Sequence, residues 1–151
     1  MPRPLNEFAG WLRFFQILIM LNLLFSVFTG VTLFESLFSD QDKLLTMGEL
    51  AQFGFVVFML YSILKIIQNP TPDVPEKIKQ YLFNIFIVAG LHFVYFTMVT
   101  LFVYGQEWAQ INTISFAAAV QTMLWTAVWR TYFERSKRVD AYYNKKADFT
   151  V

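Results

Sequence analysis

Four long stretches of the chain carry no charged side chain. With the single histidine counted as neutral, they run from Phe14 to Phe34, Leu50 to Leu64, Gln80 to Gln106 and Trp108 to Trp129. An α-helix rises about 1.5 Å per residue, so it needs roughly 20 residues to cross about 30 Å of hydrocarbon. The second stretch is the shortest, but Lys65 can extend its aliphatic stem to the interface and so lengthen the span to Ile67. The sequence therefore predicts four membrane spans, at about residues 11–34, 50–67, 80–104 and 108–133.

These stretches have the pattern of helices. A membrane-spanning β-strand shows about ten residues of alternating apolar and polar character, and none of the four alternates. The hydrocarbon core admits only helices or closed barrels, and a water-soluble bundle would need charged helix faces. We therefore expect an all-α fold, a polytopic membrane protein whose residues 1–151 form one four-transmembrane-helix bundle.

Polar residues, prolines and glycines mark the connections between the spans. Residues 35–49 contain four acidic side chains, and residues 68–79 contain three prolines within six positions. Because proline ends a helix and biases the residue before it towards extended geometry, the second helix should end near Gln68. Pro75 favours a helix start there. The third connection is expected at Gly105–Glu107.

Lysine and arginine are distributed very unevenly. Two lie near the N-terminus, three within residues 65–79 and six from Arg130 onwards, whereas the other connections hold one lysine beside five acids. The positive-inside rule places the basic side in the cytoplasm. The sequence therefore predicts a multi-pass protein with both termini cytoplasmic and with a basic juxtamembrane tail at residues 134–151.

Composition agrees with this interpretation. Hydrophobic residues make up 56% of the chain and charged residues 15%, with no cysteine and a net charge of +1. A soluble domain carries about 25% charged residues, so too little polar surface remains for a water-soluble monomer. The composition also excludes zinc sites of the cysteine type and a basic nucleic-acid binder.

Two short motifs lie at opposite ends of the predicted bundle. Gly10-Trp11-Leu12-Arg13-Phe14-Phe15 opens the first span, and Tyr132-Phe133-Glu134-Arg135-Ser136-Lys137-Arg138-Val139 leaves the last. This pattern resembles a bacterial family of four-span inner-membrane proteins classed as domain of unknown function 2569. The resemblance covers nearly the whole chain and implies a location in the bacterial inner membrane. It implies no activity, because the family has no established one.

The only histidine, His92, lies near the centre of the third span. A proton relay or a metal site would need an acid, a cysteine or a second histidine at that depth, and no span contains one. The alternative is a neutral imidazole that hydrogen-bonds across the bundle, which contributes about 0.6 kcal/mol. By depth, His92 should approach Asn22, Ser26, Gln121 or Thr122, in a polar interior shared by spans one, three and four. Span two is expected to face lipid more than the other three do, and a ligand-binding role for this interior stays open.

Five basic residues near the cytoplasmic ends are candidate contacts for lipid headgroups: Arg13, Arg130, Arg135, Lys137 and Arg138. Each charge near anionic lipid contributes about 1 kcal/mol. The same residues could instead serve only as topology determinants or bind a cytoplasmic partner. They alternate with acids and precede no recognisable nucleic-acid-binding fold, so no nucleic-acid partner is expected.

No enzyme motif is present. The sequence lacks a glycine-rich phosphate loop, a Ser-His-Asp set within the spans and a His-Glu pair on a helix. We expect no catalytic residue, metal or cofactor. The first expectation is a non-enzymatic membrane protein that binds a lipid or small hydrophobic ligand in a groove of the bundle. Alternatives are an accessory or assembly subunit that contacts another membrane protein, a homo-oligomer, or an oligomeric channel or transporter.

Overall fold

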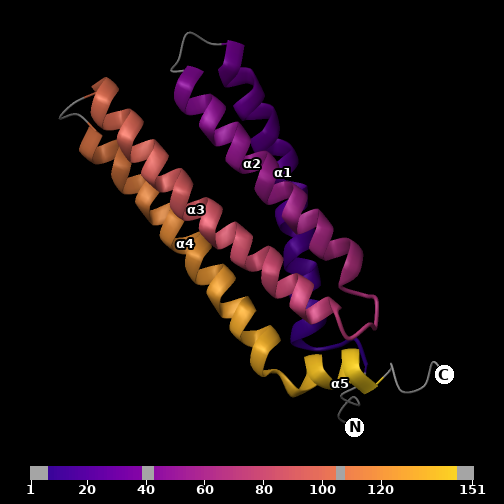
Figure 1. The fold of residues 1–151 in the computed structure, drawn as a ribbon. Coiled ribbons are helices and arrows are strands. Elements are labelled where there is room, and N and C mark those ends of the chain that lie inside the picture. The colour runs from indigo at the N-terminus through magenta and orange to yellow at the C-terminus, as the bar shows by residue number, and fades with distance from the viewer. Residues whose placement is uncertain (1–6, 39–42, 105–107, 146–151) are drawn as a thin grey trace.

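The computed structural model describes residues 7–38, 43–104 and 108–145 of the chain. Within these ranges the secondary structure is helical, with no strand. The helices are α1 (Trp11–Phe38), α2 (Lys43–Ile66), α3 (Val74–Tyr104), α4 (Trp108–Arg135) and α5 (Lys137–Lys145) (Figure 1). Three of them, α1, α2 and α3, are long and apolar enough to cross a membrane. The expected all-α fold class is therefore confirmed for the described residues.

The helices extend beyond the uncharged stretches. The sequence predicts a polar connection over residues 35–49, but α1 continues to Phe38 and α2 already begins at Lys43. Charged side chains do not end a helix, so a span can extend past the hydrocarbon into the headgroup region. The predicted end of the second helix near Gln68 agrees with the observed end at Ile66. Pro75 lies in the first turn of α3, where its missing N–H would have had no helical partner.

The four long helices form two antiparallel hairpins, α1–α2 and α3–α4, which are joined along α2 and α3 (Figure 1). The hairpins lie close together near α5 and diverge towards their other ends. The third predicted connection, Gly105–Glu107, lies outside the described residues.

The expectation that span two faces lipid more than the other three do is wrong, because α2 contacts both α1 and α3. In the most apolar 18-residue stretch of each helix, the buried share is 6% in α1, 17% in α2 and 22% in α3. Apolar side chains gain little from facing protein instead of lipid, so close packing decides which helices meet. Gly48 permits that packing, since an added Cβ would overlap the ring of Tyr95. The Tyr95 hydroxyl in turn donates a hydrogen bond of 2.7 Å to the carbonyl of Leu44.

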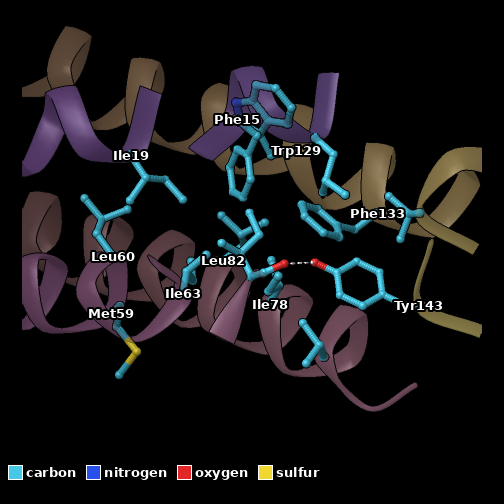
Figure 2. Packing of buried hydrophobic residues seen from close by; sticks show 14 of the residues in the cluster. Phe15, Ile19, Met59, Leu60, Ile63, Ile78, Leu82, Trp129, Phe133 and Tyr143 are labelled. Carbon is cyan, nitrogen blue, oxygen red and sulfur yellow. Dashed lines mark hydrogen bonds between the residues drawn. The ribbon is translucent and has the colours of Figure 1, made fainter. Parts of the chain in front are cut away.

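The buried core lies at the end of the bundle near α5, where both hairpins contribute to it (Figure 2). Phe15 on α1 is completely buried. Its ring centroid lies 4.4 Å from that of Trp129 and 5.2 Å from that of Phe133, both on α4. The apolar side chains from α1, α2 and α3 that pack beside these rings include Leu12, Ile19, Leu60, Ile63, Ile78, Leu82 and Ile85. The aromatic cluster therefore fastens the first hairpin to the second at this end.

Helix α5 closes the same end of the bundle. The Oγ of Ser136 accepts a hydrogen bond from the backbone N–H of Val139, which caps the start of the helix. The hydroxyl of Tyr142 donates to the carbonyl of Gln68 at 2.9 Å, and that of Tyr143 donates to the carbonyl of Ile67. These carbonyls directly follow α2, where helical carbonyls lack partners of their own. The segment predicted as a basic tail thus contains a docked helix, whose apolar side is buried.

The two motifs at opposite ends of the sequence meet at this end of the bundle. Gly10 has a φ of 60°, in the left-handed region, and a side chain there would cost about 1–2 kcal/mol. The Arg138 side chain lies against it, 3.6 Å from the position of an added Cβ, and donates a hydrogen bond to the carbonyl of Glu7. The ring of Phe8 packs edge-on against Tyr142. The start of α1 and helix α5 therefore hold each other in place.

Candidate functional site

A cavity of about 400 Å³ lies directly beyond the buried core, and all four long helices line it. Its lining residues are Asn22 from α1, Val56 and Leu60 from α2, Ile85 from α3, and Ala118, Gln121, Thr122 and Trp125 from α4. Leu60 and Ile85 also belong to the core, so the core bounds the cavity on one side. The volume falls within the range of about 300–1,000 Å³ that is typical of small-molecule sites. We refer to this space as the inter-hairpin cavity.

Helical spacing brings these side chains together. The four residues from α4 recur at intervals of three and four, so they share one face of that helix. On α1, Phe15 and Ile19 fill the core, and Asn22 follows them one turn further along the same face. The polar lining residues of α1 and α4 therefore lie on the same helix faces as the core residues, directly beyond the end of the core.

Part of the hydrogen-bonding capacity of the lining is already used within the helices. The Asn22 Nδ2 donates to the carbonyl of Leu18 at 2.8 Å, and the Thr122 Oγ1 donates to the carbonyl of Ala118 at 2.9 Å. The Asn22 Oδ1, its second N–H and the Thr122 lone pairs remain available. The amide of Gln121 makes no hydrogen bond with the described residues, and both amide side chains are exposed. The cavity therefore presents neutral donors and acceptors that a ligand could use.

The expected hydrogen bond from His92 to this polar interior is wrong. The structure brings Asn22, Gln121 and Thr122 together, but His92 lies two turns further along α3 than Ile85 and does not line the inter-hairpin cavity. Its Nε2 is buried without a hydrogen-bond partner among the described residues. Matching residues by depth assumes a closed bundle of aligned helices, whereas here the hairpins diverge.

His92 instead lines a groove of about 510 Å³ between α2 and α3, beside Gly48 and Tyr95. The other residues of this groove are Met47, Ala51, Gln52, Phe55, Val88 and Leu91. Ser26, the remaining expected member of the polar interior, lines neither space and donates its hydroxyl to the carbonyl of Asn22.

The five basic residues predicted as headgroup contacts lie at the end of the bundle that carries α5. Four of them are exposed there: Arg13, Arg130, Arg135 and Lys137. The Nε of Arg130 lies 3.2 Å from a carboxylate oxygen of Glu134, and its guanidinium stands over the Phe83 ring at 5.1 Å from the centroid. Arg138 is turned towards the backbone before α1 and is half-buried. In the described structure, Arg130 and Arg138 thus already interact with protein groups, in addition to any contact with lipid headgroups.

Two groups, Asp73 and Tyr143, have pKa values that lie far from the ordinary ones. A hydrogen bond from Lys77, together with one from Thr71, lowers the pKa of Asp73 to about 2. Burial raises the pKa of the Tyr143 hydroxyl far above its ordinary value, so the hydroxyl keeps the proton that it donates to Ile67. The contact between α5 and α2 is therefore insensitive to pH in the physiological range.

The lining of the inter-hairpin cavity contains no titratable side chain. Nowhere in the described parts of the chain do three histidine, aspartate or glutamate side chains gather as a metal site would require.

The sequence prediction missed the apolar lining of the cavity, above all Ala118 and Trp125. Their spacing to Gln121 and Thr122, at three and four residues, was the available signal. Comparison of the chain with models of known protein families, with curated proteins and with solved structures finds no match. The resemblance to domain of unknown function 2569 accordingly stays a prediction from the sequence.

Proposed function

We propose that this protein is a non-enzymatic integral membrane protein that binds a lipid or another small hydrophobic molecule in the inter-hairpin cavity. The observation that carries the proposal is a cavity of about 400 Å³ that combines apolar walls with exposed, uncharged amides. Such a combination is typical of sites for amphiphilic small molecules.

The shape of the bundle supports entry of such a molecule from the bilayer. Ring contacts between α1 and α4 join only the first turns of α1 to residues 125–133 of α4. Asn22 lies beyond these contacts and is exposed, as Gln121 is on the opposite helix. A hydrophobic molecule could therefore reach the cavity between α1 and α4 without crossing the buried core.

The proposed setting is the inner membrane of a bacterium, with four spans and both termini in the cytoplasm. The fourth span would be α4, which packs along α3 and has no charged residue from Trp108 to Trp129. Eleven of the twelve lysines and arginines lie within residues 3–13, 65–79 and 130–146, and the positive-inside rule would place these segments in the cytoplasm.

Cysteine labelling tests this orientation, because the natural sequence contains no cysteine. In intact spheroplasts, a membrane-impermeant thiol reagent should label Lys43→Cys, at the exposed start of α2, and should leave Lys137→Cys unlabelled. After permeabilisation both variants should react, which controls for accessibility. Labelling of both positions from the same side of the intact membrane would contradict the proposed topology.

Filling the cavity should abolish binding. Ala118→Trp places an indole among the lining residues, and native mass spectrometry of protein released from membranes should then show loss of the bound lipid carried by the wild type. The matched control is Ala117→Trp, the same change one residue away and outside the lining. The proposal fails if the wild type carries no lipid from its membrane, or if Ala118→Trp retains as much lipid as the control.

A further inference from the structure

We infer that the ligand of the inter-hairpin cavity is an uncharged lipid whose polar group carries hydroxyls, of the monoacylglycerol class, rather than an anionic phospholipid or fatty acid. This inference rests on the proposed function and narrows it to one ligand class. It follows from the charge, the depth and the hydrogen-bonding capacity of the lining.

The lining offers no countercharge. None of its eight residues is acidic or basic, and the one histidine of the chain lies outside it. The arginines that could neutralise a phosphate lie at the α5 end of the bundle, where Arg130 already pairs with Glu134. An anionic group in the cavity would therefore be both desolvated and unpaired, which is strongly unfavourable.

The depth of the amides strengthens this argument. Asn22 follows Trp11 by three helical turns, a rise of about 16 Å, and Gln121 precedes Trp129 by about 12 Å. Tryptophans near helix ends mark the membrane interface, so the two amides lie near the middle of a bilayer about 30 Å thick. Charged groups are costly at this depth, whereas a hydroxyl that finds hydrogen-bond partners is tolerated.

The hydrogen-bonding groups of the lining match hydroxyls. The Asn22 Oδ1 and the Thr122 Oγ1 can accept, because the hydrogen bonds of these side chains within the helices use the Asn22 Nδ2 and the Thr122 hydroxyl as donors. The free amide of Gln121 can both donate and accept, and the indole of Trp125 can donate. A glycerol hydroxyl also donates and accepts, so each hydroxyl could form two bonds with groups that would otherwise stay unpaired in hydrocarbon. The acyl chain would leave between α1 and α4, where the two helices do not meet.

The test uses two amphiphiles that share an oleoyl chain and a glycerol unit, of which the second carries in addition an anionic phosphoglycerol group. Monooleoylglycerol and oleoyl-lysophosphatidylglycerol are titrated onto the delipidated full-length protein in nonionic detergent, and binding is followed by native mass spectrometry. The uncharged lipid should bind with a dissociation constant at least about tenfold lower. Gln121→Leu should remove most of that preference, because it deletes the amide that has no other partner. Gln52→Leu, the same change in the groove that contains His92, should leave it intact.

Each alternative outcome has a separate meaning. Equal or tighter binding of the charged lipid, abolished by Ala118→Trp, overturns the ligand class and leaves the proposed function standing. Binding of monooleoylglycerol that is unaffected by Gln121→Leu also overturns the inference, because the hydroxyls then do not contact the lining. If neither lipid binds, the inference on the ligand class is overturned, and the lipid that the wild type carries from its membrane decides the proposed function separately. If the cavity instead mediates a dimer that Gln121→Leu dissociates, the proposed function fails as well.

Discussion

Replacing Tyr143 with alanine should lower the free energy of unfolding by about 3–5 kcal/mol, the usual cost of deleting a fully buried aromatic side chain. Tyr143 is completely buried, although it belongs to a helix of only nine residues. Its ring packs edge-on against Tyr142, and its hydroxyl bonds the carbonyl that follows α2. Loss of the side chain should release α5 from the bundle. Chemical denaturation in detergent micelles, followed by circular dichroism, measures the change.

Two further variants separate packing from hydrogen bonding. Tyr143→Phe keeps the ring but leaves the Ile67 carbonyl without its partner, which should cost about 1–3 kcal/mol. Tyr61→Ala is the matched control, because that tyrosine is 58% exposed on α2 and should change stability little. A Tyr143→Ala variant as stable as the Tyr61→Ala variant would show that α5 does not contribute to the folded bundle.

The docking of α5 illustrates what charge counting omits. Residues 137–145 contain lysine, arginine and aspartate, which suffice to assign the segment to the aqueous side of the membrane. The same residues place Val139, Tyr142 and Tyr143 at intervals of three and four, the spacing of one buried helix face. The charges predicted the side of the membrane, and this spacing was the evidence for a helix. What the helix packs against depends on the two carbonyls after α2, and no pattern in the sequence marks those.

The polar interior was predictable in part. Depth along the spans groups Asn22, Gln121 and Thr122, and the structure places them in one cavity. The same reasoning wrongly added His92, because depth assigns a level in the membrane and not a neighbour. Neighbours depend on how the helices cross, and here the hairpins diverge beyond the aromatic cluster. The rings that join α1 to α4 lie at one end only, and hydropathy is insensitive to their position.

Phe15 provides the strongest test of this account of the bundle. Phe15→Ala should lower the free energy of unfolding by about 3–5 kcal/mol, because the ring is completely buried and packs against Trp125, Trp129 and Phe133. It should also shift tryptophan fluorescence in the folded state, since two of those neighbours are tryptophans. Phe25→Ala removes the same side chain from the same helix at a position that is 64% exposed. That control should change neither stability nor emission.

The same pair of variants connects packing to function. Phe15 lies one turn before Ile19 and two turns before Asn22 on a shared face, and it holds α1 against α4 at the edge of the inter-hairpin cavity. Without the ring, α1 should move more freely relative to α4 while the hairpins α1–α2 and α3–α4 persist. If the proposed function holds, lipid should then bind more weakly in the cavity. Native mass spectrometry of Phe15→Ala and Phe25→Ala compares the bound lipid directly. Equal lipid occupancy in a destabilised Phe15→Ala variant would mean that the aromatic cluster stabilises the fold without shaping the cavity.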